Sequence, residues 1–428
     1  MMKPILLAKL FIISLFIPGE FHVSLGGLRL DAYRIVLGIS TIAGLSYVSR
    51  RFRHLQVPDK CILAASGWGV LSLLINHGLT EGIEKSGIFF FEIFGAYFLG
   101  RQAIVNDNRL IATYKLLGFM VLIFVIPTMI EMLTGKKVVH DIASAITGKN
   151  ILAPSLYTED YMRHGMTRAT SAFTHPILNG TICATVLPFA FYLVLRYKKP
   201  LFVVMAIGSF LSAFSALSSA PLLVIAVQVA FAGYVKLKQI IKSKMRYVIM
   251  AVCFCALVVQ LFSNRGIVKI IIQTATFNPH TGTHRLLIIE HLRDDIMRSP
   301  FFGSGLGAPW TAPTWMGQSI DNFWWATAFT YGIPFSVIVA ITGFYCISKI
   351  KVSEVPEKED YLAYAAKASV LSLMILGLTV HLFGKVNPLF YFTLGSVVFL
   401  FNPSKDQDKQ SEPQQKSYKS RRRRYARQ

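Results

Sequence analysis

The chain has 428 residues, of which 53% are hydrophobic and only 15% are charged, and its mean hydropathy is +0.50. Average soluble domains are about 25% charged, so this composition excludes an ordinary soluble enzyme and indicates a membrane protein. The formal net charge is +22. The placement of the basic residues in the loops, described below, argues against nucleic acid as the partner.

Apolar runs of the length that crosses a bilayer recur along the chain, since a helix of about 17 to 25 residues spans a hydrocarbon core of roughly 30 Å. We expect about twelve spans, with centres near residues 11, 40, 69, 94, 122, 186, 209, 228, 255, 334, 372 and 394. The first, PILLAKLFIISLFIPG, has no small-x-small cleavage site and is predicted to be an uncleaved helix. The predicted fold is therefore all-α: a polytopic membrane domain over residues 1–403.

The loops predict the orientation, because short cytoplasmic loops collect Lys and Arg. With the N-terminus inside, more than half of the 44 basic residues fall on the inner side. The inner segments are then 50–60, 101–109, 196–200, 236–246, 348–360 and the C-terminal tail. Both termini are predicted to be cytoplasmic. The tail, 404–428, ends in SRRRRYARQ and is predicted to be a disordered basic segment near an anionic membrane surface.

The same orientation leaves two long segments outside, at about 135–171 and 264–320. Both contain apolar residues throughout, which favours ordered structure over a disordered loop. The second contains a helical pattern, THRLLIIEHLRDDIMRS, which Thr283 can cap and which ends before Pro300. The expected architecture is thus a helical membrane domain with a large outer loop that contains short helices.

Arg285 lies on the apolar face of this helix. On a wheel of 100° per residue, Ile288, Leu292 and Ile296 share its face, together with Ile289. A buried arginine needs an anionic partner or a place at the membrane boundary. Three interpretations are open: an arginine that extends to the membrane boundary, an internal pair with Glu290, Asp294 or Asp295, and a bound anion.

Two further polar positions are predicted on the outer side. Arg168 precedes the span that begins near Pro176, and it is either an anchor to lipid headgroups or a second anion-binding group. Asp321 precedes the span near residue 334, and it either caps a helix or acts as a base or orienting group. Between Arg285 and Asp321, the segment SPFFGSGLGAPW has three alternate glycines that permit tight turns.

Four other polar residues are weaker candidates for a functional role. Glu92 and Glu131 lie in or near spans, where a carboxylate is either functional or paired for structure. His381 and Lys385 come at the outer end of the last helical hairpin and border the same region, but they are not taken as site residues.

Three segments resemble the signature segments of the O-antigen ligase and Wzy-type polysaccharide polymerase superfamily. They are RATSAFTHPILNG, HRLLIIEHLRDDIMRSPFFGSGLG and IDNFWWATAFTYGIP, and FIPGEFHVSLGGLRLDAYRIVLG resembles the N-terminal pattern of that superfamily. Their order and spacing match over most of the chain. The resemblance implies a glycosyltransferase-C-like membrane fold in the bacterial inner membrane. It also implies an enzyme that takes a polyprenyl-diphosphate-linked glycan on the periplasmic side, with no cofactor, metal or nucleotide sugar.

The resemblance also implies roles for individual residues. Arg168 and Arg285 match family arginines thought to bind the diphosphate, and Asp321, followed by Asn322, stands where ligases have histidine and asparagine. The base is therefore Asp321, His175 or His284, or charge neutralisation outweighs base catalysis. The substrate-binding candidates are Arg168, Arg285, His175, His284, Asn322 and Arg293.

The absence of the ligase histidine favours a polymerase of exopolysaccharide or O-antigen repeats. A ligase is the first alternative, because it shares the donor chemistry and differs in the acceptor. A lipid-linked oligosaccharide flippase or secondary transporter is the second alternative, although a carrier would place its polar site near the membrane midplane. A chain-length regulator and export machinery are expected partners of a polymerase.

Overall fold

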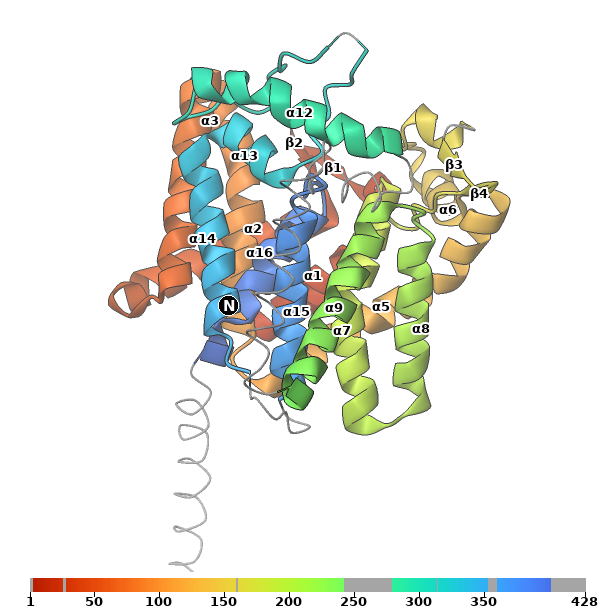
Figure 1. Ribbon diagram of the computed structural model, residues 1–428. Helices are drawn as coiled ribbons and strands as arrows, with labels where there is room; N and C mark the ends of the chain where they lie inside the picture. The colour runs from red at the N-terminus through yellow and green to blue at the C-terminus, as the bar shows by residue number, and fades with distance from the viewer. Residues whose placement is uncertain are drawn as a thin grey trace, which may run out of the picture.

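The structure is a computed structural model that describes residues 3–25, 28–158, 161–241, 279–313, 315–352 and 360–401. Figure 1 shows helices packed side by side in a bundle, with helix α12 (Pro279–Arg298) lying across one end, which we call the α12 end. The described part of the chain is mostly helical, as predicted. The predicted tail and the predicted span near residue 255 lie outside the described residues.

The first half of the chain forms six of the labelled helices. They are α1 (Pro4–Ser14), α2 (Ala32–Arg51), α3 (Val57–Phe90), α4 (Ala96–Ala103), α5 (Asp107–Thr134) and α6 (Val138–Thr147). Shorter helical turns occur at Gly19–Phe21, Phe52–His54 and Pro154–Tyr157, and a π-helical turn at Phe91–Gly95 joins α3 to α4. These elements account for the predicted apolar runs near residues 11, 40, 69, 94 and 122.

The second half supplies the remaining described helices. They are α7 (Pro176–Tyr197), α8 (Pro200–Phe214), α9 (Ser219–Ile241), α12, α13 (Phe323–Tyr331), α14 (Ile333–Lys349), α15 (Tyr361–Leu376) and α16 (Val386–Ser396). A last helical turn covers Val398–Phe401. Helix α7 begins at a proline in its first turn, as the sequence predicts. It packs against α5, α8, α9 and α15 and is therefore central in the bundle.

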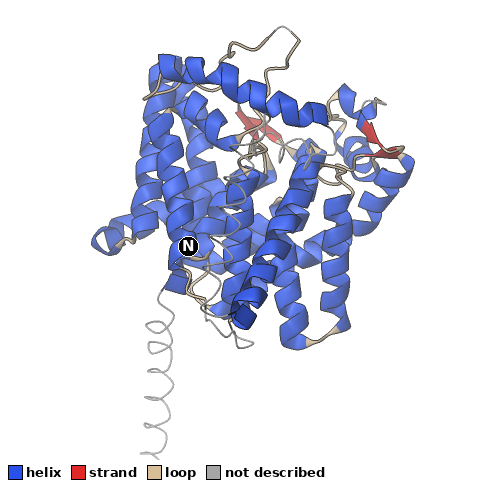
Figure 2. Ribbon diagram, viewed as in Figure 1, coloured by secondary structure: helices blue, strands red, loops and turns tan. Residues whose placement is uncertain are grey.

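Two short antiparallel hairpins were not predicted. Strand β1 (Val23–Leu25) pairs with β2 (Leu28–Leu30), and β3 (Met162–Arg163) pairs with β4 (Met166–Thr167). Figure 2 shows both hairpins toward the α12 end. Each strand has only two or three residues, too few for the alternation that identifies a strand from sequence.

Helix α3 reverses direction at Gly78, whose φ is +71°. A Cβ on Gly69 would overlap the ring of Phe89, although a straight helix would hold these residues about 30 Å apart. The segments before and after Gly78 therefore lie antiparallel. Glycine adopts this left-handed conformation without the steric cost that a Cβ brings.

Five helical stretches are long and apolar enough to cross a membrane, by length and composition. They are Ala32–His54, Val57–Ala103 (the stretch that reverses at Gly78), Asp107–Thr134, Pro176–Tyr197 and Ser219–Leu237. Shorter apolar helices, α8, α14, α15 and α16 among them, accompany these five. The fold is thus that of a helical membrane protein, and the number of twelve spans stays a prediction.

The glycine-rich segment after α12 forms tight turns, as predicted. Gly303, Gly305 and Gly307 have φ values of +65°, +87° and +82°. The segment is tied to α3, because the indole of Trp68 donates to the carbonyl of Phe301 and the ring of His77 accepts the N–H of Leu306. This contact fixes the chain that connects α12 to α13.

Candidate functional site

A cavity of about 550 Å³ lies at the α12 end, within the usual size range of ligand sites. The chain reaches it from several distant segments: the β3–β4 hairpin, the start of α7, the turn between α8 and α9, α12, the loop before α13 and the loop after α15. Its charged and aromatic polar lining residues are Tyr161, Arg163, Arg168, His175, Arg285, Asp321 and His381. Arg168, Arg285 and Asp321, which are far apart in the sequence, therefore meet in one cavity.

Arg168 follows strand β4 and is mostly buried. Its Nε donates to the carbonyl of Ala216 at 3.2 Å, and its guanidinium lies 4.9 Å from the centroid of the Tyr161 ring. Burial lowers the pKa of Arg168 from its ordinary value, but arginine remains charged at neutral pH. With Nε occupied, the two terminal nitrogens are the groups that Arg168 offers to a ligand.

The backbone after Arg168 is held by the buried carboxylate of Glu131. This carboxylate accepts from the N–H groups of Thr170 and Ser171, both at 2.8 Å, and from the hydroxyl of Thr170 at 2.6 Å. The ammonium of Lys137 lies 2.8 Å away and balances the charge. Ser171 has a φ of +57°, an uncommon conformation for a residue other than glycine. Glu131 therefore has a structural role, which was one of its two predicted interpretations.

Glu92 is likewise paired. Its carboxylate accepts from Tyr33 and Arg34, each at 2.9 Å, in the interior of the bundle. This arrangement corresponds to the structural interpretation of a carboxylate in a predicted span.

Arg285 lies on α12 beside a buried apolar face. Ile288, Leu292 and Ile296 are each at most 3% exposed, in agreement with the predicted face. The Nε of Arg285 is buried and has no hydrogen-bond partner in the described part of the chain. Burial lowers the pKa of Arg285, and the charge of Asp321 opposes that effect. An unpartnered guanidinium nitrogen at a cavity is a site for an anion.

The predicted internal pairs of Arg285 do not form among the described residues. Asp295 instead accepts from Arg298 at 2.8 Å and from the backbone and hydroxyl of Thr311. Asp295 is 6% exposed and ties the end of α12 to the segment that follows the glycines.

Asp321 lines the cavity in the loop before α13. Its Oδ1 accepts from the hydroxyl of Ser319 at 2.8 Å. The side chain that caps α13 belongs to Asn322, whose Oδ1 accepts the N–H of Trp325 at 3.1 Å. The amide of Asn322 also donates to the carbonyl of Leu378. Asp321 is thus left facing the cavity, and Asn322 has a structural role outside its lining.

Two histidines line the cavity. His175 caps α7, since its Nδ1 accepts the N–H of Ile177 at 3.2 Å. Burial, together with the nearby charge of Arg168, lowers the pKa of His175 to about 4. Burial also lowers the pKa of His381 to about 4. Both imidazoles are therefore neutral at pH 7.

Besides Asn322, two more predicted substrate-binding residues are not placed in this cavity. Arg293 lines a separate pocket beside Trp324 and Trp325. It is eight residues after Arg285, which corresponds to a rotation of about 80° and a rise of about 12 Å along a helix. His284 belongs to α12, and its side chain lies outside the described part of the structure.

Sequence reasoning did not select several of the lining residues. Tyr161 and Arg163 belong to the short hairpin segment, and the sequence places His381 near this region without marking it as a site residue. No periodic pattern identifies a hairpin of two-residue strands. The only available signal was the density of basic and aromatic residues in YMRHGMTR, residues 161–168.

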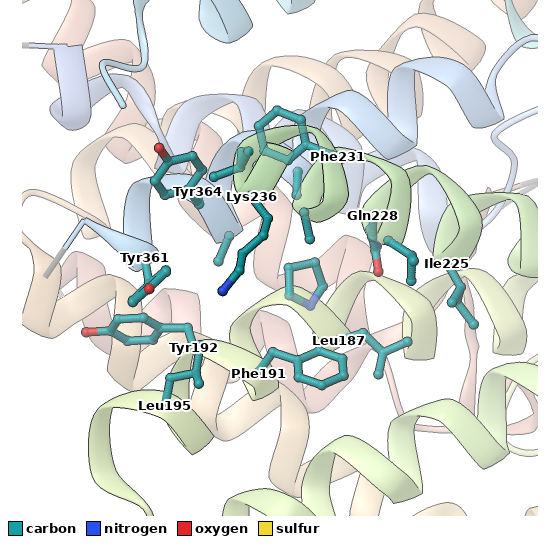
Figure 3. Close-up of a pocket in the computed structure, with 16 residues that line it drawn as sticks. Leu187, Phe191, Tyr192, Leu195, Ile225, Gln228, Phe231, Lys236, Tyr361 and Tyr364 are labelled. Atoms are coloured by element: carbon teal, nitrogen blue, oxygen red, sulfur yellow. The ribbon is translucent and has the colours of Figure 1, made fainter. Parts of the chain in front are cut away.

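A second cavity, of about 370 Å³, is mostly apolar and opens at the side of the bundle, where Phe191 and Val229 are exposed. Figure 3 shows Leu187, Phe191 and Ile225 along it, with the side chain of Lys236 extending among tyrosines. It lies between α7, α9 and α15, in the halves of these helices away from the α12 end. Its lining offers hydrocarbon contacts, whereas the cavity at the α12 end offers charges.

No known protein-family model matches the chain, and no curated protein matches it. The fold and the cavity therefore carry the functional argument. Among the described residues that line the charged cavity there are three arginines and one carboxylate. Guanidinium groups in a partly buried site are suited to phosphate or carboxylate oxygens.

Proposed function

We propose that the protein polymerises polyprenyl-diphosphate-linked oligosaccharide repeat units into exopolysaccharide or O-antigen, at the periplasmic face of a bacterial inner membrane. The observation that carries the proposal is the meeting of Arg168, Arg285 and Asp321 in one cavity at the α12 end. A cavity with several guanidiniums and one carboxylate has the groups that a glycosyl transfer from a diphosphate requires.

The reaction breaks the bond between the anomeric carbon of the donor sugar and a diphosphate oxygen. The diphosphate leaves with the electron pair, and its negative charge grows in the transition state. Arg168 offers its terminal nitrogens, and Arg285 offers a side chain with an unpartnered Nε. Donors already in place where charge develops lower the barrier, because they need no reorganisation during the reaction.

The new bond joins the same anomeric carbon to a hydroxyl oxygen of the acceptor glycan. Asp321 accepts the proton of that hydroxyl and later releases it to water. Ser319 orients the carboxylate through its 2.8 Å hydrogen bond. General base catalysis of this kind contributes about 100- to 10,000-fold in rate.

The proposed donor has a polar glycan diphosphate and an apolar polyprenyl tail. The apolar cavity supports the proposal because it offers a surface for the tail. Helices α7 and α9 contribute residues to both cavities. Ile177 and Ser219 line the charged cavity, and Phe191 and Ile225 line the apolar one. A polyprenyl tail that leaves the α12 end along these helices meets hydrocarbon surface.

A ligase and a flippase are the alternative functions. A ligase uses the same donor, so the same arginines serve it, and only the acceptor differs. A flippase moves its substrate through the bundle, and its polar groups belong near the midplane. The charged cavity at one end of the bundle favours transfer over transport.

The proposal is tested by complementing a strain that lacks this gene with wild type, Arg168→Ala, Arg285→Ala or Asp321→Ala at equal membrane expression. Arg53→Ala is the control, because Arg53 is exposed and does not line the cavity. If the protein is a polymerase, single lipid-linked repeats will accumulate on the outer face of the membrane when the site residues are replaced. Long glycan that stays on its lipid carrier indicates a ligase, and repeats trapped on the inner face indicate a flippase.

A further inference from the structure

Tyr161 and His175 form the shortest side-chain contact described at the charged cavity, with 2.6 Å between Tyr161 Oη and His175 Nε2. The other ring nitrogen, Nδ1, accepts the N–H of Ile177. A backbone N–H only donates, and a neutral imidazole has one donor and one acceptor nitrogen. The proton of His175 is therefore on Nε2, and Nε2 donates to the hydroxyl oxygen of Tyr161.

This assignment fixes the direction of the Tyr161 hydroxyl. Its oxygen already accepts from His175, so its own proton is available to another acceptor. The hydroxyl makes no other hydrogen bond with the described part of the chain. Burial raises the pKa of Tyr161, which keeps the hydroxyl protonated at neutral pH. Tyr161 thus faces the cavity as a hydrogen-bond donor.

We infer that Tyr161 donates this proton in a hydrogen bond to a diphosphate oxygen of the bound ligand, and that His175 is the positioning residue that orients it. The inference rests on the proposed function. The Arg168 guanidinium covers the Tyr161 ring at 4.9 Å, so both groups can bind one phosphate group. Sugar hydroxyls both donate and accept, whereas phosphate oxygens mainly accept. A cluster of arginine and tyrosine donors therefore matches diphosphate better than glycan.

The role of His175 follows from the same geometry. Its Nδ1 is occupied by the helix N-terminus and its Nε2 carries a proton directed at Tyr161. A base needs a free lone pair, and His175 has none that faces the cavity. This leaves Asp321 as the base among the residues predicted for that role whose side chains the structure describes.

The test measures binding of inorganic pyrophosphate to the purified full-length protein in lipid nanodiscs by calorimetry. Tyr161→Phe removes the hydroxyl and keeps the ring under Arg168. We expect the affinity of this variant for pyrophosphate to fall on the order of tenfold, as for loss of a hydrogen bond to a charged group. Tyr157→Phe is the matched control, since Tyr157 is exposed and does not line the cavity. We expect Tyr157→Phe to bind pyrophosphate with the affinity of wild type.

His175→Asn tests the positioning role, because asparagine retains a good helix cap but has no Nε2–H. We expect weaker pyrophosphate binding in this variant and no further loss when it is combined with Tyr161→Phe. Additive losses overturn the positioning role, and wild-type affinity of Tyr161→Phe overturns the inference. In that second case, reduced affinity of Arg168→Ala and Arg285→Ala leaves the proposed function standing. Wild-type affinity of both arginine variants contradicts the proposed function itself.

Discussion

The ammonium of Lys137 lies 2.8 Å from the carboxylate of Glu131, and both side chains are at most 2% exposed. The same carboxylate accepts the backbone N–H groups of Thr170 and Ser171, which are two and three residues beyond Arg168. The pair therefore connects the stability of the fold to the placement of a group in the charged cavity.

Replacing Lys137 by methionine is expected to destabilise the protein by about 3–5 kcal/mol, because it leaves a buried carboxylate without its counter-charge. The measurement is thermal unfolding in detergent, followed by intrinsic fluorescence. The neighbouring Lys136 is exposed, so Lys136→Met should unfold at the wild-type temperature. Equal melting temperatures for both variants would show that the Glu131 charge is balanced elsewhere.

Arg285→Lys is expected to lower polymer formation roughly 10- to 100-fold, because lysine offers a point charge without the planar fork of donors. The measurement is the size distribution of exported glycan at matched expression. Arg298 on the same helix has a side chain that is 70% exposed. Arg298→Lys, which keeps the charge beside Asp295, should leave the glycan unchanged. A fully active Arg285→Lys variant argues against bidentate binding.

Asp321→Asn separates base catalysis from ligand binding. Turnover of a lipid-linked repeat should fall by about 100- to 10,000-fold, as expected for loss of a general base. Pyrophosphate affinity should stay equal or increase, because a negative charge next to the anion site has been removed. Retention of wild-type turnover would mean that charge neutralisation by the arginines is sufficient.

The two buried histidines predict a pH dependence of stability. The pKa of His381 is lowered from 6.5 to about 4 in the folded protein, so the unfolded chain binds more protons between these values. The free energy of unfolding therefore has its full value above pH 6.5. It decreases as the pH drops toward 4, by about 1.4 kcal/mol per unit of pKa difference. Melting temperatures across this range should decrease less for His381→Gln than for wild type. Parallel curves for the two proteins would contradict the shift.

The parts of the site that lie on regular elements could be predicted from the sequence. Arg285 is an example, because the helix that carries it has an apolar face with a period of 3.6 residues and ends before Pro300. The start of α7 is another, since proline is favoured in the first turn. Periodicity and end signals are local, so a single sequence contains them.

The remaining parts depend on contacts between distant segments. Tyr161 reaches the cavity from a hairpin of two-residue strands, and His381 reaches it from a loop of the last helical hairpin. Arg293 was predicted as a substrate-binding residue, and it lines another pocket. Packing of the helical bundle determines which loops meet at the α12 end. Local sequence patterns do not predict these contacts.

The attachment of α12 has a consequence for variants far from the cavity. Asp295 fixes the helix to Thr311, and it is ten residues, about 15 Å, from Arg285. A tilt of a few degrees about this attachment moves the guanidinium by about 1 Å, and a misplacement of that size can cost about 100-fold in rate. A loss of activity on replacing Asp295 would thus reflect helix alignment, although Asp295 itself lies outside the cavity.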